Sequence, residues 1–252
     1  MKNVVTNPQR SADEPLPAGI TGTLTVGLNA GNRLLVQSHD DAGLPVGLAP
    51  DIALGLAAYL GLRCSFKMFE TLAALIEAAD IGAWDISFMA PDPMRADRLE
   101  FSYPYATLGA AYLVRASSNF TCPADVDQEG SRIVAPHGAA FGLWLERHVT
   151  RAGIVWVRDG SEAVQLLADE RADAMAGLRG MLEPISTTNA AFRLLDQDFT
   201  RIEQTIATPR PPRANLPAIN GFIFESLASG TVSRLIAKHR IRGVSAFSSE
   251  GS

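Results

Sequence analysis

The sequence is short of charge, of cysteine and of long apolar runs, and each shortage excludes a class of protein. Charged residues make up 19% of the chain and the net charge is −5, with no run of Lys or Arg. That balance gives no basic signature for a nucleic-acid partner. No apolar stretch reaches the ~18–20 residues that span a bilayer, so we expect no direct membrane insertion.

Metal and disulfide chemistry also lack support in the sequence. Cys64 and Cys122 are the only cysteines, and their spacing predicts neither a disulfide framework nor a zinc site. The four histidines show no metal-ligand spacing either. We therefore expect two free thiols and no cofactor.

Hydrophobic residues, by contrast, are plentiful and regularly patterned. They form 47% of the 252 residues, enough for one large domain or two ordinary ones. Strand and helix patterns alternate from Leu24 onward, which predicts an α/β fold with parallel sheets. We expect strands near residues 62–68, 84–89, 110–114, 132–135, 154–157, 172–176 and 202–206. We expect helices near residues 51–60, 72–79, 141–151, 161–168, 215–227 and 231–240, with caps at Thr71 and Ser161, and an exposed connector over 208–213.

The segment from Trp84 to Tyr105 carries the strongest chemical signal. A buried strand ends in a polar turn, Asp92 and Pro93 mark a helix start, and Arg95 lies just inside that helix. A guanidinium at such a place can hold a carboxylate through two parallel hydrogen bonds. The alternative is a surface arginine paired with a nearby carboxylate, Asp97 or Glu100.

Five motifs in order make the chain similar to a known family. The motifs are Leu24–Gly27, Gly47–Ala53, Arg95 with Phe101–Tyr105, Arg171–Ala174 and Ala228–His239. Together they resemble the bacterial extracellular solute-binding proteins of family 3, the amino-acid-type periplasmic receptors of ABC importers. The resemblance spans about Thr21 to His239.

The resemblance implies a two-lobe, type II periplasmic-binding-protein-like fold. Each lobe is a mainly parallel sheet flanked by helices, and two strands form the hinge. We place lobe 1 at residues 21–114 and 209–245 and lobe 2 at 115–208, with tails at 1–20 and 246–252. The chain is expected to cross between the two lobes near Val114–Ala116 and again near Gln204–Thr208.

The same resemblance implies a ligand site to which both lobes contribute. Arg95 would bind the ligand carboxylate from lobe 1, and the turn at Gly138 would offer backbone N–H groups from lobe 2. Lobe 1 would further supply Asn29, Asn32, Arg33, Glu70, Thr71, Phe88, Met89 and Ala90. Lobe 2 would further supply Ala139, Ala140, Phe141, Leu178 and Arg179.

Departures from the family pattern bear on the ligand. The carboxylate that meets an amino-acid ammonium group is replaced by Leu178, with Arg179 beside it. Asn29 and Asn32 stand where the family has an aspartate and a stacking aromatic. A buried ammonium group without a partner costs several kcal/mol. We therefore expect a carboxylate ligand, an organic acid or a modified amino acid, rather than a zwitterionic amino acid.

Three functions remain open. In the first, the chain is a solute-binding protein, a monomer and no enzyme, which closes on its ligand for an ABC importer permease or a sensor. In the second, it is a cyclohexadienyl-dehydratase-like lyase, with Glu70, His137 or Glu183 as the acid. In the third, it is a cytoplasmic ligand-sensing module. The residues after Met1 lack the apolar core of a signal peptide, which favours the cytoplasm. The family resemblance instead implies the periplasm.

Overall fold

The computed structural model describes residues 22–248, and the chain divides into two compact units. Unit 1 comprises the chain up to Ala106, Glu203–Arg240 and the residues from Ser245 on. Unit 2 comprises Thr107–Ile202 and Ile241–Val244. The expected tail over residues 1–20 lies outside the described residues, and of the tail expected at 246–252 only residues 246–248 are described.

Unit 1 is built on a mixed sheet in the order β4-β1-β5-β12, with β6 along β12. Its strands are β1 (Thr23–Asn29), β4 (Arg63–Phe69), β5 (Ile86–Met89), β6 (Leu99–Phe101) and β12 (Thr200–Pro209), which enters the unit at Glu203. β1 runs parallel to β4 and β5, whereas β12 runs antiparallel to β5 and β6. The expected turn at Asp40–Gly43 is confirmed, because it joins β2 (Ser38–His39) to β3 (Pro45–Val46).

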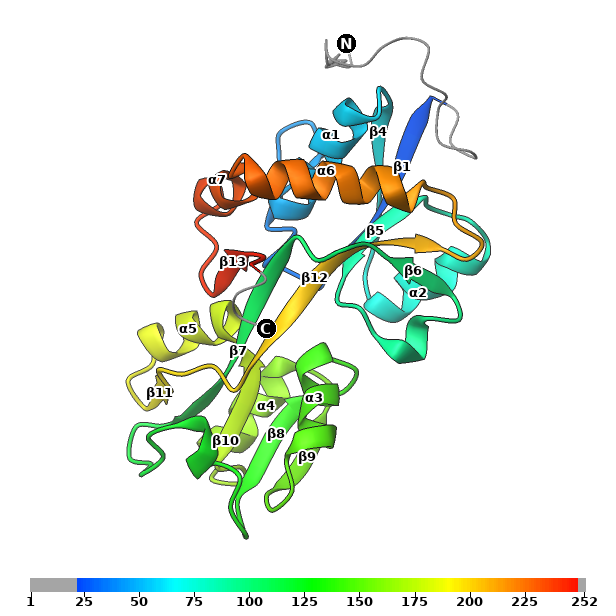
Figure 1. Ribbon diagram of the computed structural model, residues 1–252. Coiled ribbons are helices and arrows are strands. Elements are labelled where there is room, and N and C mark those ends of the chain that lie inside the picture. Colours follow the sequence, from blue (N-terminus) through cyan, green and yellow to red (C-terminus); the bar gives the residue numbers. More distant parts are fainter. Residues whose placement is uncertain (1–21, 249–252) are drawn as a thin grey trace. The chain divides into compact units, whose positions relative to one another are not determined.

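Helices cover both faces of this sheet. α1 (Leu48–Tyr59) contacts β1 and β4, and α6 (Leu216–Ala228) and α7 (Thr231–Lys238) pack on α1 (Figure 1). α2 (Leu72–Asp80) lies on the other face, where a Cβ on Gly27 would be 2.7 Å from Leu75 and 2.9 Å from Trp84. Gly27 therefore stands where α2 approaches the sheet too closely for a side chain.

Short polar side chains cap two helical turns of unit 1 that border the predicted site. Thr71 caps α2 as expected, because its side chain accepts a hydrogen bond from Ala74 N. Asp92 caps the turn that carries Arg95, and its Oδ1 accepts from Met94 N. The helix expected there is wrong in length, because only one 3-10 turn forms, over Pro93–Arg95.

The exposed connector expected over Thr208–Arg213 is partly wrong. Thr208 and Pro209 are buried in β12, and only residues 210–213 are exposed. The Thr208 hydroxyl donates to Asp85 O and accepts from Arg213 N and Ala214 N. The bond to Asp85, which is distant in the sequence, and the two bonds from the following loop hold the end of β12 inside the unit.

Unit 2 contains a second mixed sheet, in the order β7-β10-β8-β9. Its strands are β7 (Ala106–Arg115), β8 (Arg132–Pro136), β9 (Gly153–Val157) and β10 (Ala174–Leu178), with β11 (Phe192–Leu194) antiparallel to β7. β8 is parallel to β9 and β10, and β10 is antiparallel to β7. β13 (Val244–Ala246) begins in the short C-terminal segment of unit 2, where Gly109 N donates to Gly243 O at 2.8 Å.

Alternate residues of these strands face two different cores. Ile133, Ala135 and Tyr112 pack with α3 (Ala140–His148), whereas Val134 and Leu113 pack with α4 (Gly160–Ala168) and α5 (Arg179–Thr188). Such alternation is what a sheet with two covered faces requires.

Two helix boundaries in unit 2 differ from expectation. α3 ends at His148 and not near residue 151, because Val149 is already extended. The cap of α4 is Asp159 rather than Ser161, since the Asp159 carboxylate accepts from Ser161 N and Glu162 N. A carboxylate two residues earlier thus does what the serine hydroxyl was expected to do.

Candidate functional site

The carboxyl ends of β1, β4 and β5 bring part of the predicted set together at one edge of the unit 1 sheet. Asn29 lies beside Phe69 in the β1–β4 register, and Ala30 N donates to Phe69 O. Glu70 and Ala90 directly follow β4 and β5. Parallel strands present their ends at the same edge, where open α/β sheets bind ligands.

Arg95 reaches this edge from the 3-10 turn. Its side chain is 12% exposed, and its Nη1 lies 3.5 Å from Ala90 O. Its Nε lies 3.5 Å from Asp92 Oδ2, so Asp92, and neither Asp97 nor Glu100, is its acidic neighbour. Burial lowers the pKa of Arg95, and the charge of Asp92 opposes that shift. Both contacts are long, so the guanidinium retains donors for a further acceptor.

Two predicted apolar residues are core residues on opposite faces of β5. Phe88 is 5% exposed and meets the ring of Tyr105 edge-on at 5.8 Å. Met89 is 3% exposed and packs with Leu75, Trp84 and Leu99. Phe88 thus lies on the face away from α2, and Met89 lies under that helix.

The other predicted residues of unit 1 are less buried. The Asn29 side chain accepts from Gly31 N, and Asn29 O accepts from Asn32 N, so this pair shapes the turn after β1. Arg33, Glu70 and Thr71 are exposed. Thr71 is accounted for as the cap of α2.

The predicted anion turn of unit 2 follows β8. Gly138 has φ +74°, Ala139 is the extended residue before α3, and Ala140 begins that helix. No side chain of Ala139 or Ala140 can cap these N–H groups, and the first N–H groups of a helix lack partners within it. Phe141 is 7% exposed and belongs to the core on the α3 face.

Leu178 and Arg179 lie at the same sheet edge as this turn, because β8 and β10 are parallel neighbours. Leu178 packs against the α3-face core. Arg179 has three partners within unit 2: its Nε donates to Asp198 Oδ1 at 2.6 Å, and its Nη2 donates to Leu195 O and Asp196 O. The structure therefore gives Arg179 an internal partner that the sequence analysis did not identify.

Sequence reasoning also missed two polar residues close to β5. Tyr105 is 1% exposed and Gln204 is 3% exposed, and each has a side-chain oxygen without a hydrogen-bond partner. Tyr105 closes the Phe101–Tyr105 motif, so its position was visible in the sequence. Nothing in the sequence marked Gln204, because its burial depends on β12 pairing with β5.

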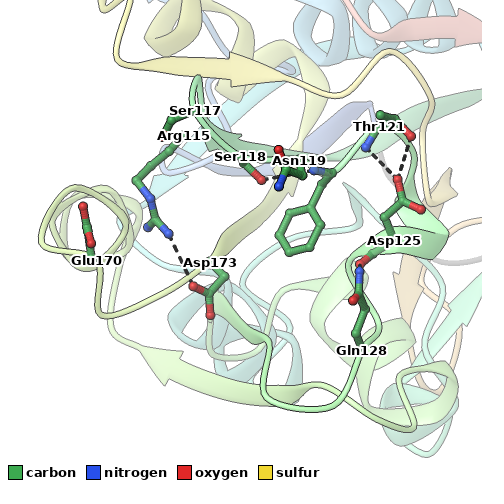
Figure 2. A pocket seen from close by; sticks show the side chains of 10 residues that line it. Arg115, Ser117, Ser118, Asn119, Thr121, Asp125, Gln128, Glu170 and Asp173 are labelled. Carbon is green, nitrogen blue, oxygen red and sulfur yellow. Dashed lines mark hydrogen bonds and ion pairs between the residues drawn. The ribbon is translucent and has the colours of Figure 1, made fainter.

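A hollow of about 700 Å³ lies elsewhere in unit 2 (Figure 2). None of the predicted site residues lines it. Its polar groups bind one another: Arg115 pairs with Asp173 at 3.4 Å and donates to Ala172 O, and Asp125 accepts from Thr121. With its donors used in this way, Arg115 has little left for a ligand in the hollow.

The three candidate acids of the lyase hypothesis belong to different elements of the two units. Glu183 accepts from Arg242 at 2.7 Å, and His137 is exposed and stacks on Trp156 at 5.1 Å. Glu70 is exposed in unit 1. Within residues 22–248, no three acidic, His or Cys side chains group as a metal ion would require, and no helix has the length and apolar character to cross a bilayer. Both cysteines are free thiols, as expected.

Comparison with known proteins agrees with the fold and the motifs. The L-cystine-binding protein TcyJ of Escherichia coli K12 is 26% identical over 220 residues, which cover 86% of this chain and 82% of that protein. The crystal structure of an ancestral amino acid-binding protein, a precursor of cyclohexadienyl dehydratase, matches with a TM-score of 0.69 and 25% identity over 86% of this chain and 95% of that one.

A third relative shares the fold at lower identity. The arginine-bound substrate-binding protein AbpA of an amino acid ABC transporter from Streptococcus pneumoniae has a TM-score of 0.68 and 18% identity over 86% of this chain and 94% of its own. The fold is that of the type II periplasmic binding proteins. Residues 24–241 match the family model directly, and the chain therefore belongs to the bacterial extracellular solute-binding proteins, family 3.

Proposed function

We propose that this solute-binding protein closes on a small carboxylate-containing metabolite, an organic acid or a modified amino acid, for an ABC-type importer or a sensor. Arg95 binds the carboxylate, and the N–H groups that follow Gly138 contribute to the same ligand. We place the protein in the periplasm, the usual compartment of its family.

The state of Arg95 is the observation that supports the proposal. A guanidinium that is 12% exposed has given up most of its hydration, yet its two contacts are both 3.5 Å long. Removing a charge from water is costly unless strong partners replace the water. A ligand carboxylate with two short hydrogen bonds would supply that compensation.

The residues at the expected ammonium position support the proposed ligand class. Leu178 offers no charge, and the nearby carboxylate of Asp198 is occupied by Arg179. The named relatives bind cystine and arginine. We propose that this chain departs from them and binds acids that lack a free α-ammonium group.

A thermal-shift screen of organic acids and amino acids followed by calorimetry tests the proposal. A ligand that binds the folded form raises the unfolding temperature. Arg95→Ala should reduce the affinity for the best acid about a hundredfold or more, since two charge-assisted bonds of about 1.5–3 kcal/mol each are lost.

Arg98→Ala is the matched control. Arg98 lies one turn further on, and its Nε donates to Asp80 at 2.9 Å. This variant should keep the wild-type affinity. Undiminished binding by Arg95→Ala, or a screen in which only free amino acids stabilise the protein, would contradict the proposal. Analysis of the bound acid for chemical change separates a receptor from a lyase.

A further inference from the structure

Three buried side-chain oxygens in the described part of the chain lack any hydrogen-bond partner: Ser87 Oγ, Tyr105 OH and Gln204 Oε1. All three belong to unit 1, and their residues are 0%, 1% and 3% exposed. Folded proteins pair the great majority of buried polar groups, so each exception needs an explanation, and a bound ligand is one.

Tyr105 and Gln204 lie together on one face of the sheet. Thr205 stands across from Met89 and Ile206 across from Phe88, so one further step places Gln204 across from Ala90. Tyr105 N donates to Gln204 O at 2.9 Å, and the Tyr105 ring meets Phe88 edge-on. Side chains alternate along a strand, so Ser87 lies on the opposite face.

Gln204 and the guanidinium that holds the ligand in the proposed function both adjoin Ala90. Arg95 Nη1 is 3.5 Å from the carbonyl of Ala90, the residue across from Gln204. Gln204 Nε2 already donates to Glu203 O at 3.0 Å, which leaves the side-chain carbonyl as an unused acceptor. A buried cation and a buried acceptor therefore flank the same residue at the end of β5.

We propose that Gln204 Oε1 accepts a hydrogen bond from a hydroxyl or amide N–H group of the ligand whose carboxylate Arg95 binds, with the Tyr105 hydroxyl as a second polar contact. This inference rests on the proposed function and narrows its ligand class. The ligand is an acid that carries a neutral donor close to the carboxylate, such as a 2-hydroxy acid or an amide-bearing acid.

The test compares acids that differ only in that donor, malate against succinate and 3-phenyllactate against 3-phenylpropionate. Calorimetry on the wild-type protein identifies the pair of acids that binds more tightly. Within that pair the hydroxy acid should bind about tenfold more tightly than its deoxy form, which is the effect of one hydrogen bond. Gln204→Met keeps the length of the side chain without the acceptor and should abolish this preference. Ser87→Ala removes the unpartnered oxygen on the other face of the sheet and should retain the preference for the hydroxy acid.

Thermal unfolding without ligand adds an independent readout. Tyr105→Phe removes a buried hydroxyl that has no partner in the protein, so its unfolding temperature should equal or exceed that of the wild type. A drop of several degrees would show that the hydroxyl is bonded inside the protein and would overturn its role.

The outcomes separate the two proposals. If no acid stabilises the wild type, or Arg95→Ala binds as well as wild type, the proposed function fails and this inference fails with it. If acids bind through Arg95 but hydroxy and deoxy forms bind equally, or Gln204→Met keeps the preference, only the inference is overturned.

Discussion

Arg179 and Asp198 form an ion pair, with Nε and Oδ1 2.6 Å apart, that is bracketed by two glycines. A Cβ on Gly109 would lie 2.3 Å from Asp198 Oδ2, and a Cβ on Gly243 would lie 2.9 Å from Arg179 Cβ. Gly109 N also donates to Gly243 O, so the two backbone segments are joined beside the pair. The lack of side chains at both glycines is therefore a condition for this ion pair.

Replacing Gly109 with alanine should destabilise the protein. The new methyl group would overlap the Asp198 carboxylate, and overpacking of this kind typically costs about 1–3 kcal/mol of unfolding free energy. Urea denaturation measures the loss. Gly160→Ala is the control, because a Cβ there meets nothing closer than 3.8 Å. Equal stability of the two variants would contradict the close approach at Gly109.

Arg179 itself can be tested as a structural residue against its predicted role in ligand binding. Arg179→Met should lower the unfolding free energy by about 1–3 kcal/mol, because charge-assisted hydrogen bonds are lost and Asp198 is left without its partner. Affinities for mono- and dicarboxylates should change in the same proportion. A selective loss of dicarboxylate binding would instead assign Arg179 to the ligand.

Asp127 should make the protein sensitive to acid. Burial of its carboxylate tends to raise the pKa, but hydrogen bonds from Ala152 N, Arg151 N and Thr150 lower the pKa from 3.8 to about 2. Because the folded pKa lies below the unfolded one, the stabilisation is complete above about pH 4 and is lost as the pH falls toward 2.

Urea denaturation at several pH values between 2 and 6 checks this expectation. Asp127→Asn should be less stable than the wild type at pH 6, and the difference should narrow toward pH 2. Asp97→Asn, which replaces an exposed carboxylate, is the control for the change of charge. If the difference in stability between Asp127→Asn and the wild type were the same at every pH, that result would contradict the lowered pKa of Asp127.

The two thiols should differ in reactivity. Burial raises the pKa of the Cys64 thiol to about 12, so almost no reactive thiolate exists at pH 8. Alkylation at pH 8 should therefore modify Cys122 well before Cys64 in the folded protein, and both equally in urea. Mass spectrometry of the labelled peptides gives the order, and Cys64→Ser verifies the assignment.

The features that local chemistry decides were predictable from the sequence. The caps at Thr71 and Asp92 and the turn at Asp40–Gly43 depend on side chains that bond to backbone groups a few residues away. The order of strands and helices followed from hydrophobic periodicity, and the family motifs indicated the fold. The cap of α4 was missed because Asp159 and Ser161 are both good capping residues, and only the structure shows which one acts.

The features that depend on distant partners were not predictable in the same way. Thr208 is buried because its hydroxyl binds Asp85 O, 123 residues away in the chain. Arg179 looked free because Asp198, its partner, belongs to no motif. The unpartnered oxygen of Gln204 emerges only when β12 lies beside β5. Whether Arg95 and the Gly138 turn bind one ligand stays a prediction.

The insertion of unit 2 into unit 1 has a consequence for a newly made chain. β5 receives its second neighbour, β12, only after residues 107–202 have been synthesised. Until then the nascent first segment carries an open strand edge of Ile86, Ser87, Phe88 and Met89, and such edges invite pairing with other chains. The time taken to synthesise residues 107–202 and to reach β12 should therefore govern how much of the protein escapes aggregation during biosynthesis.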